Sequence, residues 1–146
     1  MLGEKLTTRH LDEILKDIDS EAELKEYLEL PGRESPFGSF IEYYRSLPKL
    51  KNVVPADLYK LASIDRSYCY HIWDGTKTPG RDKILLLCIA AGLDNDETRR
   101  ALEAGGEAVL YPRSRRDCII AYSIRRGLDV FHTNSLLNEA GLDPLK

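Results

Sequence analysis

Glycine and proline divide this chain into short segments in which apolar residues recur three and four positions apart. Leu11, Leu15 and Ile18 illustrate the spacing near the N-terminus. Such spacing places apolar side chains on one face of an α-helix, whereas a half-buried strand would alternate apolar and polar residues. Val53-Val54 and the stretch 108–111 are the nearest approaches to a strand, and both are too short. The sequence therefore predicts an all-α fold of about nine helices.

Helix-starting and helix-ending residues predict where these helices lie. Ser20 with Glu23, and Asp94 with Glu97, have the spacing of capping boxes. Glycines placed after apolar helices are typical of the C′ position, and prolines stop or open a helix. Together these signals predict helices over residues 11–18, 20–28, 35–47, 55–62, 65–73, 81–91, 94–104, 114–126 and 129–140.

Part of the chain repeats at an offset of 35 residues. Arg81-Asp82 matches Arg116-Asp117, and Gly92-Leu93-Asp94 matches Gly127-Leu128-Asp129. Gene duplication explains the match, and so does convergence on the same caps and core positions. Either way, residues 81–111 and 113–146 are predicted to form two stacked helical hairpins of the same shape.

Charge is distributed unevenly along the 146 residues. Residues 1–30 carry four basic and nine acidic side chains, a net charge of −5, while the rest of the chain is slightly basic. The overall charge of −3 therefore does not exclude a nucleic-acid partner. We expect an acidic N-terminal helical arm (1–32), a helix–turn–helix domain (33–111) and a C-terminal helical hairpin packed on that core (112–146).

The expected compartment follows from the cysteines and from apolar run lengths. The three cysteines form no C-x-x-C pair, which fits a reducing compartment. Neither a signal peptide nor a run of about 20 apolar residues is apparent, so a cytoplasmic protein away from membranes is expected. Cys88 and Cys118 lie at helical spacing among apolar residues, which predicts that both thiols are buried and unreactive.

Residues 54–93 carry the main functional signal. Two short helices are expected on either side of a tight turn at Ser63-Ile64, with Leu58, Ala62 and Ile64 packing on Tyr68 and Ile72. The second helix would then present a polar face to solvent. A short helix held at a fixed angle by its predecessor fits the DNA major groove, which is about 12 Å wide.

The residues of this segment resemble a known family. Ile64-Asp65-Arg66-Ser67-Tyr68, then Ile72, then Gly75-x-Lys77-x-Pro79 resembles the motif of the Cro/repressor-like helix–turn–helix family (XRE type). The later segment 110–117 resembles a subgroup of small bacterial regulators. The resemblance implies a lambda-repressor-like core and a transcription regulator that binds double-stranded DNA as a homodimer, on half-sites about one turn apart.

Candidate contact residues follow from this resemblance and from the expected polar face. Base edges would be read by Arg66, Ser67, Tyr70 and His71, and Lys77 would reach a phosphate. A possible secondary basic patch comprises Arg113, Arg115 and Arg116. Since cations at a helix start oppose the helix dipole, we expect compensation from Asp117, from acids on a neighbouring hairpin such as Glu103 and Glu107, or from an anionic partner.

A second hypothesis keeps the scaffold and changes the partner. Many family members have a phosphate-binding Gln at the start of the first motif helix, where this chain has Val54-Pro55 and contains no Gln at all. Aromatic Tyr70 and Trp73, expected to be exposed, and the acidic arm favour a protein-interaction module without DNA, such as an antitoxin-like or kinase-partner adaptor. The apolar stripe of the arm would serve as a dimerisation surface or cover a docked partner.

Enzyme chemistry finds little support in the sequence. His10, His71 and His132 are scattered and lack the H-E-x-x-H spacing of zinc hydrolases. No glycine-rich phosphate loop is present. We therefore expect no enzyme activity, no catalytic or metal site and no cofactor.

Overall fold

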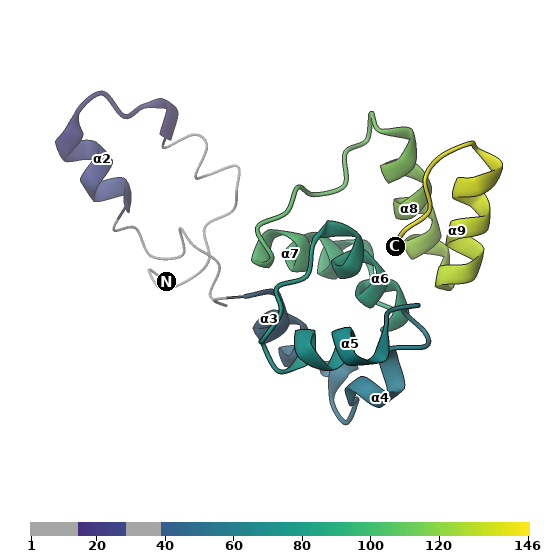
Figure 1. The fold of residues 1–146 in the computed structure, drawn as a ribbon. Helices are drawn as coiled ribbons and strands as arrows, with labels where there is room; N and C mark the ends of the chain where they lie inside the picture. Colours follow the sequence, from purple (N-terminus) through teal and green to yellow (C-terminus); the bar gives the residue numbers. More distant parts are fainter. Residues whose placement is uncertain (1–14, 29–38) are drawn as a thin grey trace. The chain divides into compact units, whose positions relative to one another are not determined.

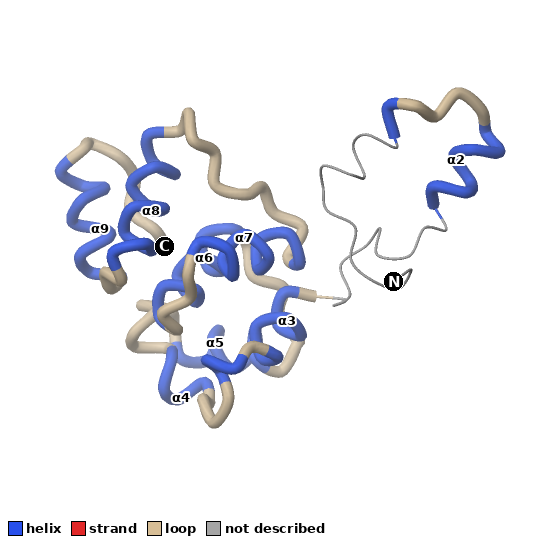
Figure 2. The backbone as a smooth tube through the Cα atoms, turned by 180° about the vertical axis from the view of Figure 1, so that it is seen from behind, coloured by secondary structure: helices blue, strands red, loops and turns tan. Residues whose placement is uncertain are grey.

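The computed structural model describes residues 15–28 and 39–146, and the chain divides into two compact units, residues 1–36 and 37–146. The described residues form helices and turns without any strand, so the predicted all-α class is confirmed (Figures 1 and 2). In chain order the elements are α2 (Glu21–Leu28), α3 (Phe40–Ser46), the 3₁₀ turn η1 (Pro48–Leu50), α4 (Pro55–Leu58), α5 (Arg66–Trp73), α6 (Arg81–Ala90), α7 (Asn95–Ala104), α8 (Arg115–Arg126) and α9 (Val130–Glu139). The helix expected over residues 11–18 lies mostly outside the described residues.

Local capping explains most of these boundaries. The Asp94 carboxylate accepts from the Glu97 backbone N–H at 2.7 Å, and the Glu97 carboxylate accepts from the Asp94 N–H at 3.0 Å, which completes the predicted capping box. At α2 the Ser20 hydroxyl accepts from the Glu23 N–H at 3.1 Å. These bonds satisfy backbone donors that the first helical turn leaves unpaired.

One helix start was predicted wrongly. α3 begins at Phe40 rather than at Pro36, because Ser39 is the N-cap, with an extended backbone and a hydroxyl that accepts from the Glu42 N–H at 3.3 Å. Ser39 and Glu42 have the S-x-x-E spacing of a capping box, a signal that the preceding Ser-Pro pair obscured. The helix ends before Pro48, as predicted.

Helix α6 lies at the centre of the second unit. Its residues from Ile84 to Ile89 are all buried, so the helix is apolar around its whole circumference. The Tyr44 hydroxyl of α3 donates to the Leu87 carbonyl at 2.7 Å, and burial raises the pKa of Tyr44 far above its usual value. Helices α3 and α7 also pack together, which encloses α6 on this side.

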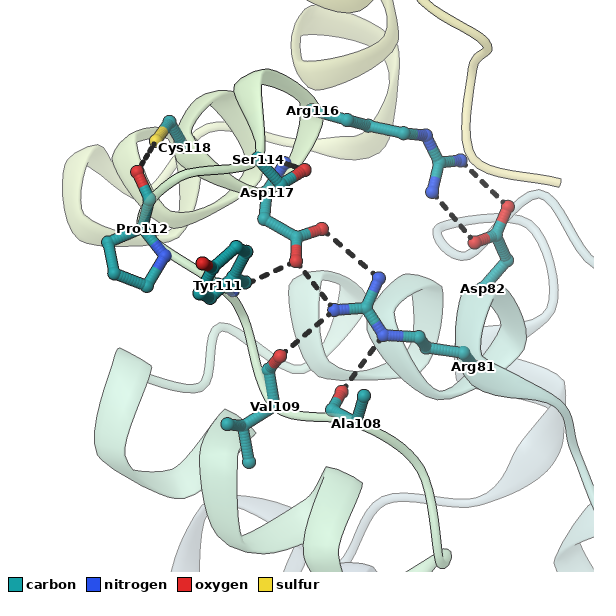
Figure 3. Close-up of polar contacts among 10 residues, drawn as sticks. All are labelled: Arg81, Asp82, Ala108, Val109, Tyr111, Pro112, Ser114, Arg116, Asp117 and Cys118. Carbon is teal, nitrogen blue, oxygen red and sulfur yellow. Dashed lines mark hydrogen bonds and ion pairs between the residues drawn. The ribbon is translucent and has the colours of Figure 1, made fainter.

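Helices α6–α7 and α8–α9 form two hairpins joined by two reciprocal ion pairs. The Arg81 guanidinium donates to both oxygens of Asp117 at 3.1 and 2.8 Å (Figure 3). Arg116 donates in the same way to both oxygens of Asp82 at 3.1 and 2.9 Å. Each arginine thus binds the aspartate of the other hairpin, an exchange that two-fold-related units make.

The surrounding hydrogen bonds repeat with the same offset of 35 residues. Arg81 donates through Nε to the Ala108 carbonyl and Arg116 to that of Asp143, both at 2.9 Å. The two aspartates accept from the backbone N–H groups of residues 111 and 146. The prediction of two hairpins of the same shape is therefore confirmed, whereas their origin by duplication stays a prediction.

Candidate nucleic-acid interface

The two short helices expected on either side of Ser63-Ile64 are α4 and α5, which pack against each other. Helix α4 ends at Leu58 rather than at Ala62, because residues 59–63 form turns. Leu58, Ala62, Ile64 and Ile72 are buried between them as expected, while Tyr68 is only half-buried. The turn is tight because Ser63 adopts a left-handed conformation with φ of +56°, and the Ile64 N–H then donates to the Tyr59 carbonyl at 3.0 Å. This bond pattern closes a helix end and fixes the angle at which the next helix leaves.

The predicted contact residues of α5 share one exposed face. Arg66, Ser67, Tyr70 and His71 are all exposed and span an arc of about 140° at 100° per residue. The buried face of α5, with Cys69 and Ile72, lies on the other side of the helix. The sequence pattern therefore identified which side of this helix meets solvent.

Lys77 lies in the exposed loop after α5. Its backbone N–H donates to the His71 carbonyl at 3.0 Å, so the loop folds back against the last turn of the helix. The Asp74 carboxylate accepts from the Thr76 N–H at 2.8 Å, and its bonds from Thr76 hold the pKa of Asp74 below its usual value. This turn keeps Lys77 close to the helix end.

The acidic residues of this motif accept hydrogen bonds from nearby backbone N–H groups, while its cations have no acidic partner among the described residues. Asp57 and Asp65 accept from backbone N–H groups at 3.0 and 3.1 Å, like Asp74 in the loop. Among the residues that the structure describes, the cations of the motif form no ion pair; these are Lys60, Arg66 and Lys77. The motif thus offers cations that an anionic partner can neutralise.

Arg66 is held by two aromatic rings. Its guanidinium carbon lies 6.0 Å from the ring centre of Tyr59 and 5.7 Å from that of Tyr70. The Lys60 ammonium also lies 5.9 Å from the Tyr59 ring. Sequence reasoning missed Tyr59 and Lys60 as part of this surface. The signal available in the sequence was the spacing of Tyr59 and Arg66, which lie seven residues apart with the tight turn between them.

Trp73 is not an exposed aromatic residue, so that expectation is wrong. The indole is half-buried and meets the Tyr44 ring edge-on at 6.4 Å between ring centres. Arg45 of α3 covers it, with the guanidinium carbon 4.8 Å from the ring centre. Trp73 therefore contributes to the packing of α5 against α3.

The structure separates Arg116 from the two other arginines of the predicted secondary basic patch. Arg116 is committed to Asp82, and its pKa is raised by the hydrogen bonds to that carboxylate. Arg113 and Arg115 are exposed, and neither forms an ion pair with a described residue. Asp117 lies next to Arg116 but pairs with Arg81. Compensation of Arg116 by an acid of the neighbouring hairpin is confirmed, although the acid is Asp82 rather than Glu103 or Glu107.

The prediction for the cysteines is correct for Cys88 and wrong for Cys118. Cys88 is fully buried, and burial raises the pKa of its thiol to about 12. Cys118 is exposed, and its Sγ lies 3.0 Å from the Pro112 carbonyl oxygen (Figure 3). The two positions differ because helix α6 is enclosed on all sides, whereas α8 has one open face.

Comparison with protein-family models, curated proteins and solved structures returned no match to this chain. Among the described residues, no helix is both long enough and apolar enough to cross a membrane. The same residues place no three His, Cys, Asp or Glu side chains together as a metal site would require.

Proposed function

We propose that this protein is a cytoplasmic, sequence-specific DNA-binding transcription regulator of the Cro/repressor-like helix–turn–helix type. Helix α5 would enter the major groove, and a homodimer would place two such helices on half-sites about one DNA turn apart. The observation that carries the proposal is the exposed face of α5, where Arg66, Ser67, Tyr70 and His71 stand opposite a buried face that anchors the helix.

The chemistry of that face suits DNA. An arginine can donate two hydrogen bonds to a guanine edge, and hydroxyl or imidazole groups can exchange hydrogen bonds with bases. Lys60 and Lys77 are cations on either side of α5 in the sequence, and neither pairs with a described acid. Phosphate contacts by such residues would supply affinity that falls steeply as salt rises.

The test is a selection of preferred sites from random duplex DNA by the full-length protein, followed by binding measurements over a range of salt. Arg66→Ala should weaken binding to the selected site by about 1–3 kcal/mol and relax the preference at one or two base pairs. Lys77→Ala should weaken all sequences alike and reduce the salt slope by about one. Arg99→Ala, which removes the same charge from α7, serves as the control.

A protein-interaction role is the second candidate, and one observation favours it. The guanidinium of Arg66 lies over two tyrosine rings, and Leu61 beside them in the chain is 58% exposed. Aromatic, arginine and apolar groups on one surface are typical of protein interfaces. A salt slope near zero on duplex DNA, with no site enriched, would favour this role over DNA binding.

A further inference from the structure

The two hairpins are alike in shape, but only the first has its outer face covered. Leu86 and Leu87 of α6 are buried, and the carbonyl of Leu87 accepts from Tyr44 of α3. Lys83, one turn earlier, has its ammonium 5.7 Å from the ring centre of Tyr68 on α5. Helices α3 and α5 therefore cover this side of the first hairpin.

The equivalent face of the second hairpin is open. An offset of 35 residues takes Leu86 and Leu87 to Ala121 and Tyr122 of α8. Ala121 is half-buried and the Tyr122 side chain is 45% exposed. The described elements leave Tyr122 and Arg125 of this face exposed, whereas Tyr44 of α3 and Tyr68 of α5 contact the counterpart face.

An open groove of about 350 Å³ lies on this face. Its walls come from the start of α7, the connection before α8 and one side of α8, and they are mostly apolar; the lining residues are Asn95, Leu110, Tyr111, Pro112, Asp117, Cys118, Ala121, Tyr122 and Arg125. The acidic residue among them is not available, because Asp117 already binds Arg81 and the Tyr111 N–H.

The charged group that remains in the groove is a cation. Arg125 is exposed, its guanidinium carbon lies 5.8 Å from the ring centre of Tyr122, and it forms no ion pair with a described residue. The equivalent position on the first hairpin is the uncharged Ala90. The cation of the covered face is Lys83 in the first turn of α6, whereas the cation of the open face is Arg125 in the last turn of α8.

We propose that this groove binds an acidic amphipathic helix of a partner protein, with apolar side chains between Tyr111 and Tyr122 and a carboxylate on Arg125. The same side of the first hairpin contacts two helices, through Tyr44 of α3 and Tyr68 of α5, so this shape accepts helices. The apolar walls favour a protein side chain over a phosphate backbone, and the arginine favours an acid. This inference is independent of DNA binding by α5.

The test uses a display library of helical peptides selected against the full-length protein, with the enriched peptide then synthesised. We expect enriched sequences with apolar residues three and four positions apart and flanking Asp or Glu. Arg125→Glu should weaken the peptide about tenfold or more, since it replaces an attractive pair by a repulsive one. Arg126→Glu is the matched control, because this neighbour carries the same charge but does not line the groove.

Cys118 reports directly on the groove. It is exposed and lines the groove, whereas Cys69 and Cys88 are buried, so alkylation of the folded protein measures this thiol. The bound peptide should slow its alkylation. Enriched peptides without acids, equal effects of the two arginine variants, or an unprotected Cys118 would overturn the proposal. Protection by duplex DNA instead of peptide would assign the groove to nucleic acid and overturn it as well.

Discussion

Asp82 and Asp117 each accept hydrogen bonds from a bidentate arginine and from a backbone N–H. The backbone donor is Lys146 for Asp82, 64 positions along the chain, and Tyr111 for Asp117, six positions away. Their side chains differ in exposure, at 26% for Asp82 and 7% for Asp117. Burial acts to raise the pKa of each carboxyl, but the hydrogen bonds from Arg116 and Arg81 outweigh it and hold both pKa values below the usual one. Both carboxylates are therefore stabilised in their charged form.

Replacing one partner of these pairs tests how strongly they join the hairpins. Asp117→Asn should lower the free energy of unfolding by about 2–4 kcal/mol. It removes the charge of the less exposed carboxylate and leaves the Arg81 guanidinium without its charged partner. Asp82→Asn should cost less, about 1–2 kcal/mol, since this carboxylate is more exposed. Urea unfolding followed by circular dichroism measures both, and a larger loss for Asp82→Asn would contradict the assignment.

The same carboxylates predict a dependence of stability on pH. A carboxyl whose pKa is lower in the folded state contributes stability above its unfolded pKa of about 4, and that stability is lost as pH falls through the folded pKa. We expect the free energy of unfolding to fall below about pH 4. The fall should be smaller in Asp117→Asn, which lacks one of the two titrating groups. An unchanged acid transition in that variant would contradict the prediction.

The α6–α7 and α8–α9 hairpins use the same helix-end geometry with different residues. Gly105 after α7 and Ala140 after α9 are related by 35 positions and have nearly the same backbone angles, φ of −84° with ψ of 1° and 0°. A Cβ atom at Gly105 would clash with the Ile84 side chain and lie 3.4 Å from Phe40 Cβ. The first hairpin therefore favours a glycine here because the Ile84 side chain of α6 occupies the space that a Cβ atom would take.

This difference predicts an asymmetric pair of substitutions. Gly105→Ala should destabilise the protein by about 1–3 kcal/mol, because the added methyl group crowds the buried Ile84 side chain. Ala140→Gly should cost less than about 1 kcal/mol, mainly through the greater freedom of the unfolded chain. Chemical denaturation of the two single variants gives both values, and equal costs would mean that the Ile84 side chain does not decide the residue at this position.

The buried apolar core that the structure describes lies in the second unit. Its residues all fall between Phe40 and Leu145. In the first unit, the apolar residues Leu15 and Leu24 of the predicted arm stripe are 47% and 40% exposed. These two exposed leucines are a surface that a second copy of the arm can cover.

Deletion of residues 1–30 tests the arm as a dimerisation surface. We expect the shortened chain to keep its melting temperature within a few degrees, because its core is complete, and to have the mass of a monomer by light scattering. A full-length protein of twice that mass is the control. If the shortened chain keeps the mass of a dimer, the arm is not the dimer surface, and the 113–146 hairpin becomes the candidate.

Most helix boundaries could be predicted from the sequence because they depend on contacts within one turn. The Asp65, Asp94 and Asp129 caps each bind a backbone N–H three residues ahead. The repeat of 35 residues likewise predicted hairpins of one shape. The exposed face of α5 followed from the same periodicity. The start of α3 was predicted wrongly because the sequence contains two competing N-cap signals, Ser35-Pro36 and Ser39, and the helix uses the second.

Only the tertiary structure decided which side chains meet across the chain. Arg116 could have been balanced by its neighbour Asp117, but the two hairpins exchange partners and Asp82 lies there instead. Cys88 and Cys118 have similar surroundings in the sequence, yet α3 and α5 cover one hairpin and leave the other open. Burial depends on elements distant in sequence, and helical periodicity reports only which residues share a face.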